Sequence, residues 1–312
     1  MPAVPPDNPM SEAKVLLGQR LFFDPGISVT GRYSCASCHD PARAFTDGRR
    51  LAVGATGEPL NRNAMSLANV AWNVSFGWTD PRPRTLEVQM LKPLLNERPI
   101  ELGVRGRERA LLARLAADPD YLQGFTAAFP GDAPLTFRHL VQAIAAFERT
   151  LVSGRSPFDR YVFDGEHDAL TPEAKRGFDL FFSARIGCAG CHSGFNFGGN
   201  WRDAQGATGR ASFASDGTTA RPIRVPGLRN VALTAPYMHD GRFATLAEVL
   251  AHYSAIGARR AAADPGASAS ASASADRRLP HAPFSAAETA DLAAFLNSLT
   301  DPDFTARFSA AR

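Results

Sequence analysis

Apolar residues recur along most of this chain at intervals of three and four, which is the spacing of one face of an α-helix. The pattern is clearest over 137–151, with a shorter stretch around 111–115. Two further helices, expected over 245–256 and 285–299, begin with a Ser/Thr-x-x-Glu capping box. Strand-like alternation is scarce, so we expect a mostly α fold.

Two stretches lack the helical pattern. Residues 193–226 are rich in Gly, Asn, Ser and Arg, and we expect them to form a long loop. Residues 266–275 alternate Ala and Ser, a composition that cannot bury a core. We therefore expect a disordered surface insertion near 261–277.

The composition is that of a soluble globular protein, with 45% hydrophobic and 21% charged residues. The net charge of +3 is too small to indicate a nucleic-acid partner. No apolar run approaches the roughly 20 residues that a membrane span needs, so we do not expect a membrane-spanning protein.

The four cysteines carry the most specific signal. They form two Cys-x-x-Cys-His motifs, Cys-Ala-Ser-Cys-His at 35–39 and Cys-Ala-Gly-Cys-His at 188–192. This pattern is typical of covalent c-type haem attachment, in which two thiols bond the haem and the next histidine binds the iron. A redox Cys-x-x-Cys pair or a zinc site would leave both histidines unexplained. We expect two covalent haems on Cys35, Cys38, Cys188 and Cys191, with His39 and His192 as the proximal iron ligands.

The two motifs lie in similar surroundings, which indicates an internal repeat. Each follows a segment that begins Glu-Ala-Lys and ends Leu-Phe-Phe, at 12–23 in the first copy and 173–182 in the second. Each segment is expected to form a short helix that ends in an aromatic cluster beside a haem. The simplest organisation is two cytochrome c-like domains, 1–155 and 156–312, joined by helices and long loops.

The sixth ligand of each iron decides between electron transfer and catalysis. A second protein ligand makes an electron carrier, whereas an open position makes a reactive centre. No histidine occurs between His39 and His139, so the first haem lacks a nearby distal histidine. An open iron there can bind and cleave peroxide while protein acid–base groups move the protons.

Several motifs follow one another in an order that resembles a known family. They are Phe23-Asp24, Cys38-His39-Asp40-Pro41, Phe45-Thr46-Asp47-Gly48, Asn61-Arg62-Asn63, Leu86-Glu87-x-Gln89, Glu101-Leu102-Gly103, Val-Pro-Gly-Leu-Arg-Asn-Val at 225–231 and Ala-Pro-Tyr-Met-His-Asp-Gly at 235–241. With these motifs the chain resembles the di-haem cytochrome c peroxidases, and within them the MauG-like branch. The segment Leu-Asn-Glu-Arg-Pro-Ile-Glu-Leu-Gly at 95–103 most resembles the MbnH sub-group.

The resemblance implies roles around the first haem. His39 is the proximal ligand of the peroxide-reactive haem, Glu101 is the distal acid–base carboxylate, and Gln89 is the distal-pocket amide. The interval from Gln89 to Glu101 is slightly long for the family, which leaves Glu97 as a rival for the acid–base role. Without the resemblance, Glu101 would be a surface carboxylate and Gln89 a solvated helix residue.

Two further features bear on the type of enzyme. Trp78 matches the tryptophan that relays electrons between the two haems, although by itself it would be taken for a core aromatic. Conventional members block the peroxidatic iron with a histidine in the segment that matches 55–58, and this sequence has none there. That departure removes the need for reductive activation and favours the MauG-like branch.

The second haem discriminates further. Conventional members supply a methionine as its sixth ligand, fourteen positions after the histidine that matches His239, and that position is Tyr253 here. Tyr253 shares a helix face with Leu246 and Leu250, so we expect it to point inward. The resemblance and the register favour Tyr253 as a tyrosinate ligand, with Met238 as the alternative ligand. Taken alone, Tyr253 would be an ordinary core tyrosine.

The resemblance also implies a calcium site. Asn63, Thr234 and Pro236 match it, through one side-chain carbonyl and two backbone oxygens, which are the hard donors that calcium prefers. Each of these would otherwise be an ordinary turn residue.

These features favour a MauG/MbnH-like oxidoreductase that uses hydrogen peroxide to form a high-valent two-haem state and oxidises an aromatic residue, expected to be Trp, of a partner protein. The alternatives are a conventional peroxidase supplied with electrons by a small redox protein, and a non-catalytic dihaem electron carrier. Glu101 argues against the carrier and Tyr253 against the conventional peroxidase. Because bacteria attach c-type haem outside the cytoplasmic membrane, we expect a periplasmic protein with a periplasmic partner, and a signal peptide that is absent from this sequence.

Overall fold

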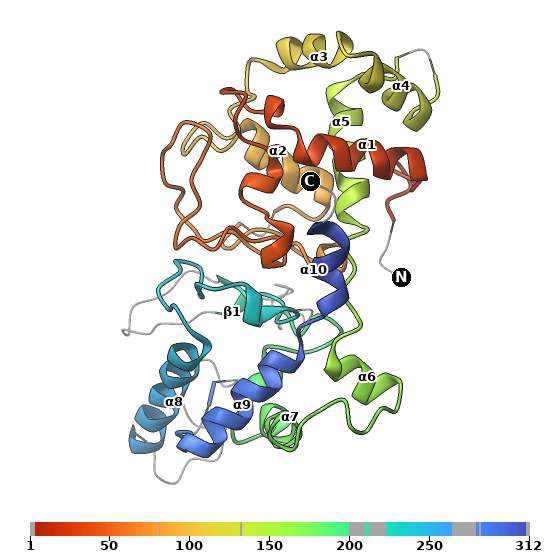
Figure 1. The fold of residues 1–312 in the computed structure, drawn as a ribbon. Coiled ribbons are helices and arrows are strands. Elements are labelled where there is room, and N and C mark those ends of the chain that lie inside the picture. Colours follow the sequence, from red (N-terminus) through yellow and green to blue (C-terminus); the bar gives the residue numbers. More distant parts are fainter. Residues whose placement is uncertain are drawn as a thin grey trace. The chain divides into compact units, whose positions relative to one another are not determined.

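The computed structural model describes residues 4–80, 82–131, 133–199, 210–211, 223–263, 279–280 and 282–309. The described chain is mostly helical, so the mostly α fold expected from the sequence is confirmed (Figure 1). Its helices are α1 (Glu12–Phe23), α2 (Leu86–Leu95), α3 (Glu108–Ala116), α4 (Pro119–Ala128), α5 (Phe137–Glu148), α6 (Pro157–Phe163), α7 (Pro172–Phe182), α8 (Leu246–Ala263), α9 (Ala286–Ser298) and α10 (Pro302–Ser309). None of them is long and apolar enough to cross a membrane.

Two details differ from the expected elements. Within the expected loop at 193–226, β1 (Arg210–Ala211) pairs antiparallel with β2 (Ile223–Arg224). The helix expected to end at Ile256 continues to Ala263, because the residues that follow are mostly Ala and Arg, which are good helix formers. The Ala-Ser alternation at 266–275 lies outside the described residues.

The chain divides into two compact units. The first unit comprises residues 1–77, 81–152 and 305–312, and the second comprises 78–80 and 153–304. The short segment Trp78–Asp80 thus belongs to the second unit, and residues 305–312 belong to the first. The domain bounds expected from the sequence, 1–155 and 156–312, stay a prediction.

In the first unit, α1 crosses α5 at Gly18. A methyl group on Gly18 would come within 1.9 Å of the carbonyl oxygen of Ala143, so the two helix backbones are in direct contact there. One turn further on, the ring centroid of Phe22 lies 5.2 Å from that of Phe147 and 5.9 Å from that of Phe45. These three buried rings form the centre of the first core.

In the second unit, α7 crosses α9 in the same way. A methyl group on Gly177 would come within 1.9 Å of the carbonyl oxygen of Asp291. The Phe181 ring lies 5.0 Å from that of Phe295 and 5.9 Å from that of Phe197. The repeated sequence segments at 12–23 and 173–182 therefore form the same helix crossing and the same aromatic core in each unit.

Side-chain caps determine where these helices begin. Ser11 Oγ accepts a hydrogen bond from Lys14 N, and Thr171 Oγ1 accepts one from Ala174 N. Ser285 caps α9 through a reciprocal capping box with its third residue. Each cap contributes about 1 kcal/mol by satisfying an amide that the helix leaves unpaired.

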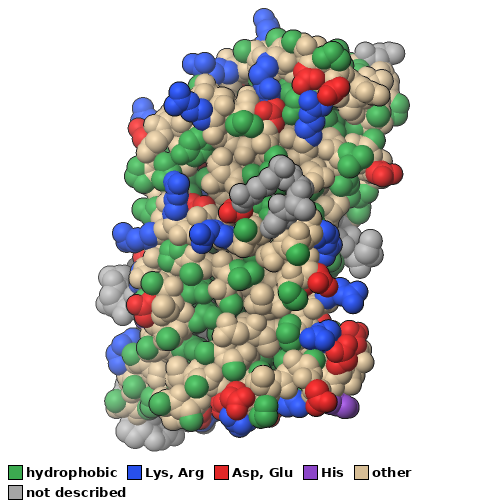
Figure 2. Space-filling model, in the orientation of Figure 1, with side chains coloured by type: hydrophobic (Ala, Val, Ile, Leu, Met, Phe, Trp, Pro, Cys, Tyr) green, Lys and Arg blue, Asp and Glu red, His purple; other side chains and the backbone are tan. Residues whose placement is uncertain are grey.

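Charged side chains of both signs are interspersed over the face drawn in Figure 2. This distribution agrees with the small net charge of +3. On that face no broad field of one sign is present that would attract a highly charged polymer.

The helix crossing of the first unit leads to a stability prediction. Gly18→Ala should lower the free energy of unfolding by about 1–3 kcal/mol, because the added methyl overlaps a backbone carbonyl that cannot rotate away. Gly124→Ala in α4 is the matched control, since its methyl would meet only Leu17 Cδ1, at 3.3 Å. We expect the control to be neutral or slightly stabilising on helix propensity. Denaturant unfolding followed by circular dichroism measures both, and equal effects would contradict a direct backbone contact.

Candidate functional site

Each Cys-x-x-Cys-His motif folds into a single helical turn. The first turn begins at Cys35, whose carbonyl accepts a hydrogen bond from His39 N at 3.0 Å. The second begins at Cys188, whose carbonyl accepts one from His192 N at 2.8 Å. A turn of this kind brings both thiols and the following imidazole to one side of the backbone, as attachment of a planar haem requires.

The two histidines are held by the same hydrogen bond. His39 Nδ1 lies 2.9 Å from the carbonyl oxygen of Phe45, and His192 Nδ1 lies 2.9 Å from that of Phe197. A carbonyl oxygen can only accept, so Nδ1 carries the proton and Nε2 keeps its lone pair. Burial lowers the pKa of both imidazoles, which favours the neutral form that binds a metal. Both motifs therefore fit a covalent haem with histidine on its iron.

Gln89 and Glu101 lie on segments that pack against each other in the first unit. Gln89 is on α2, and its side-chain oxygen is buried without a hydrogen-bond partner. Glu101 is followed by Leu102, whose backbone amide donates to the carbonyl of Pro93. Pro93 lies on α2, as Gln89 does. A buried carbonyl oxygen without a donor is costly, which fits a pocket that receives a polar ligand.

Glu101 is electrostatically coupled to the first haem-attachment turn. Burial raises the pKa of Glu101, opposed by the charge of Lys92 and by a hydrogen bond from Asn96. Burial also raises the pKa of the Cys38 thiol to about 11, with the charges of Asp47 and Glu101 adding to the effect. The charge of the Glu101 carboxyl group therefore acts on this turn.

Glu97, the rival carboxylate, lies in a different environment. Its side chain is 71% exposed and forms an ion pair of 3.8 Å with Arg105. A solvated carboxylate of this kind has no means of controlling protons in a buried pocket. Glu101 remains our candidate for the acid–base group.

The segment that carries the distal histidine in conventional members is a turn here. Gly57 N donates to the carbonyl of Gly54, and Ala55 N donates to that of Glu101. The other histidine of this unit, His139, is engaged at the start of α5, where its ring stacks on Phe129 at 4.1 Å. Neither feature brings a second imidazole to the first attachment turn.

Tyr253 lies on α8, and the charges of the second attachment turn act on its hydroxyl. Burial raises its pKa most, and the charges of Cys191 and Cys188 raise it further. His252, its neighbour, instead contacts the Phe243 ring at 5.2 Å. Met238, the alternative ligand, lies in a turn in the left-handed conformation with a φ of 74°.

The remaining expected site residues are placed as follows. The Trp78 ring lies edge-on to His239 with centroids 6.4 Å apart, and its carbonyl accepts from Arg224 N. Asn63 donates its side-chain amide to the carbonyl of Arg49 at 2.8 Å. Thr234 Oγ1 donates to the carbonyl of Val231 at 3.0 Å, and Pro236 follows a cis peptide bond. Calcium binding by Asn63, Thr234 and Pro236 remains a prediction.

Comparison with known proteins identifies the family. The sequence profile described as di-haem cytochrome c peroxidase matches residues 12–168. The methylamine utilization protein MauG of Methylorubrum extorquens is 39% identical over 263 residues, which cover 82% of this chain and 72% of that protein. The chain belongs to the di-haem cytochrome c peroxidase family.

Other relatives lie on both sides of the family's division. Cytochrome c551 peroxidase of Pseudomonas aeruginosa is 33% identical over 257 residues, 78% of this chain and 72% of that protein. A crystal structure of a MauG-like protein associated with microbial copper homeostasis superposes with a TM-score of 0.81 and 36% identity, covering 97% of this chain and 94% of that one. The dihaem peroxidase BthA of Burkholderia thailandensis, at 24% identity, shares the fold with a TM-score of 0.72.

Membership of the di-haem cytochrome c peroxidase family settles the cofactor and the reaction class. The chain has two cytochrome c-like domains and is a haem-dependent oxidoreductase that acts on peroxide. The family carries two haem c groups, which matches the two attachment turns.

Three functional positions were not found from the sequence. The carbonyls of Phe45 and Phe197 orient the two histidines, and both residues adopt the left-handed conformation. Alignment of the two repeats could have found them, because each Phe follows its histidine by five or six positions. Glu148 ends α5, and burial raises its pKa to about 8. It interacts electrostatically with Cys35, which only the packing of the chain reveals.

The geometry of the first site predicts the effect of Glu101→Gln. If Glu101 takes a proton from bound peroxide, the substitution should slow the reaction with peroxide by ~10²-fold or more, as loss of a positioned acid–base group does. The carboxylate is the active form and burial raises its pKa, so the wild-type rate should fall as the pH drops through that raised value. The variant should lose this pH dependence.

Stopped-flow spectroscopy of the ferric protein measures the rate, and the resting spectra of both haems should be unchanged. Glu97→Gln is the matched control and should react at the wild-type rate, because that carboxylate is exposed. A normal rate in Glu101→Gln would remove Glu101 from the mechanism.

Proposed function

We propose that this protein is a MauG/MbnH-like oxidoreductase. In this function peroxide reacts at the haem attached through Cys35 and Cys38, and the oxidising equivalents are shared with the second haem. They are then used to oxidise an aromatic residue, which we take to be Trp, on a separate protein. The observation that supports the proposal is that the charges of Cys191 and Cys188, the cysteines of the second attachment turn, act on Tyr253.

Tyr253 decides what the second haem can do. Its hydroxyl is buried, which penalises the phenolate as long as no cation is near. The charges of Cys191 and Cys188 oppose the phenolate as thiolates, but these charges disappear when the sulfurs form thioether bonds. A haem iron bound at this turn would then be the dominant charge and would favour the deprotonated form of Tyr253. A phenolate stabilises oxidised iron more than a thioether does, so this site suits storage of an oxidising equivalent.

Gln89 and Glu101 serve the reaction with peroxide in the first unit. The haem supplies the redox chemistry, and the protein supplies proton transfer and orientation. Glu101 takes the proton from the incoming peroxide and returns one to the leaving oxygen. The unsatisfied side-chain oxygen of Gln89 accepts a hydrogen bond from the same ligand and holds it in the pocket. No histidine in the 55–58 segment competes for this position.

Trp78 is our candidate for electron transfer between the haems. Its ring contacts that of His239, which belongs to the Ala-Pro-Tyr-Met-His-Asp-Gly motif that precedes α8. An indole can be oxidised by one electron, which is the chemistry that a relay needs. We also propose a periplasmic location, because haem of this type is attached outside the cytoplasmic membrane in bacteria.

The relatives supply both the support for this proposal and its main rival. A MauG-like protein at 36% identity and the M. extorquens MauG at 39% support a place in the MauG-like branch. The relatives named cytochrome c peroxidase favour reduction of peroxide with electrons from a small redox protein. The ligand of the second haem distinguishes the two, since the rival function needs that haem to accept electrons.

Tyr253→Met therefore tests the proposal. The substitution should raise the reduction potential of the second haem and abolish a long-lived oxidised state after peroxide is added, because a thioether does not stabilise oxidised iron. Tyr161→Met is the control, since Tyr161 lies in the same unit and contacts Lys175 and His167 instead of the attachment turn. Time-resolved absorption gives the lifetime. An unchanged spectrum and lifetime in Tyr253→Met would favour the conventional peroxidase.

A further inference from the structure

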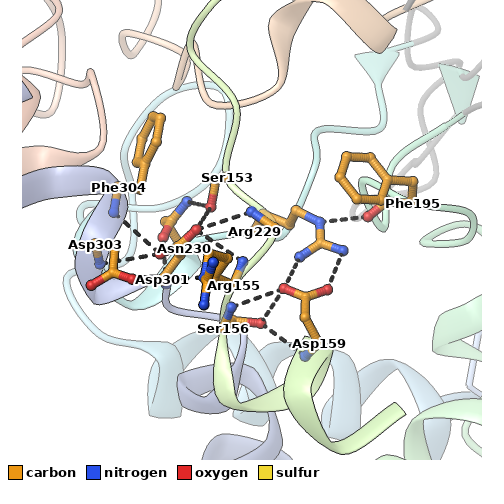
Figure 3. A network of polar contacts seen from close by, with 11 residues as sticks. Ser153, Arg155, Ser156, Asp159, Phe195, Arg229, Asn230, Asp301, Asp303 and Phe304 are labelled. Carbon is orange, nitrogen blue, oxygen red and sulfur yellow. Dashed lines mark hydrogen bonds and ion pairs between the residues drawn. The ribbon is translucent and has the colours of Figure 1, made fainter. Parts of the chain in front are cut away.

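A buried ion pair between Arg229 and Asp159 lies against the loop that follows the second attachment turn. Arg229 Nη1 and Nη2 contact the two carboxylate oxygens of Asp159 at 2.7 and 2.8 Å (Figure 3). The two side chains are 2% and 5% exposed, which makes this the most buried ion pair of the described chain. Ser156 donates to the same carboxylate through both its amide and its hydroxyl, so the acid is fully satisfied.

A pair of this kind is not explained by stability alone. The cost of removing two charges from water offsets most of their attraction, and an apolar pair of the same volume is often as stable. What a bidentate pair adds is a fixed geometry, because the planar guanidinium matches the carboxylate in only one arrangement. The ion pair therefore gives Arg229 a fixed position from which it can hold a neighbouring group.

Arg229 holds the loop that carries the hydrogen-bond acceptor of His192. Its Nε donates to the carbonyl of Phe195 at 2.6 Å, and its guanidinium lies 4.2 Å from the centre of the Phe195 ring. The neighbouring amide of Leu228 donates to the carbonyl of Asn196 at 3.0 Å. The next carbonyl along the loop, that of Phe197, accepts the hydrogen bond from His192 Nδ1. Two consecutive carbonyls are thus fixed directly before the acceptor.

Asn230, the residue after Arg229, is held by a second set of hydrogen bonds. Asn230 donates to Ser153 Oγ at 2.9 Å and accepts from the amide of Asp301 at 2.8 Å (Figure 3). Asp301 is completely buried, and its Oδ2 also accepts from Ser153 Oγ. Arg229 therefore extends from a rigid base toward the loop.

The first unit offers an internal comparison. Asn69 matches Asn230, since both residues have a left-handed backbone, with φ of 55° and 61°. The backbone amide of Asn69 donates to the carbonyl of Leu151, just after α5. The backbone amide of Asn230 donates in the same way to the carbonyl of Leu299, just after α9. The residue before Asn69 is Ala68, in the place of Arg229. The first attachment turn therefore has the same backbone frame without the guanidinium, so the ion pair is an addition specific to the second site.

We propose that Arg229 and Asp159 are positioning residues for His192 that adjust the reduction potential of the second haem. By fixing the loop before Phe197 they keep its carbonyl in line with His192 Nδ1. A strong hydrogen bond at Nδ1 makes Nε2 a better electron donor and so stabilises ferric iron. The inference rests on His192 as iron ligand and is independent of whether the enzyme oxidises a partner protein.

The test is a spectroelectrochemical titration of both haems in the holoprotein. Arg229→Lys keeps the charge and loses the paired contacts, so it should weaken the preference of the second haem for the ferric state about tenfold, which is about 59 mV toward higher potential for a one-electron couple. Ser156→Ala removes one hydrogen bond to Asp159 and should shift the potential less, in the same direction. The first haem should keep its potential in both variants.

Arg160→Gln is the matched control. Arg160 lies on α6 next to Asp159, but it forms an exposed ion pair with Glu166, so its substitution should leave both potentials unchanged. The EPR signal of the second haem should change with its potential, which a loss of stability alone would not produce. Wild-type potentials and EPR signals in a folded, fully loaded Arg229→Lys protein would overturn the proposal, as would equal shifts at both haems. If Arg229→Lys does not retain its second haem, a wild-type potential in Ser156→Ala overturns it.

Discussion

The hydrogen bond from each attachment-site histidine to a phenylalanine carbonyl is the constraint on which the rest of this structure depends. At 2.9 Å in both units, it fixes the tautomer of His39 and of His192 and leaves Nε2 for the iron. The acceptor residues must adopt a left-handed backbone to turn their carbonyls inward, and their rings are then available for the aromatic core. Histidine orientation, loop conformation and core packing therefore depend on one another, and the same arrangement occurs once in each unit.

On this common frame the two units differ at a few positions that give them different chemistry. In the first unit the charge of Glu101 acts on the Cys38 thiol, and α5 ends with the half-buried Glu148, where the second unit has Leu296. In the second unit the charges of the cysteines act on Tyr253, and Arg229 holds the loop whose Phe197 carbonyl accepts from His192. Titratable groups therefore lie at the first attachment turn, where we propose that peroxide reacts, whereas the second turn has the proposed ligand and its rigid support. This asymmetry is the physical basis for assigning one site to reaction and the other to storage.

Much of this arrangement could be predicted from the sequence because it depends on local pattern. The attachment motifs, the helix caps at Ser11, Thr171 and Ser285, and the repeated Leu-Phe-Phe segments all act over a few residues. The exchange of 78–80 and of the chain end between units could not be predicted, since it depends on contacts distant in sequence. The same holds for Glu148, which follows the apolar stripe of α5 and looks solvated until the packing places it beside Cys35.

We propose that the resting protein needs no prior reduction, because the first iron would have an open position and the second would be held oxidised by Tyr253. The most direct measurement is the EPR and electronic spectrum of the ferric protein before and after one equivalent of peroxide, without any reductant. We predict one high-spin and one low-spin haem at rest. After peroxide is added, both EPR signals should disappear as a long-lived oxidised state forms. A ferric protein that is inert to peroxide until one haem has been reduced would contradict this proposal.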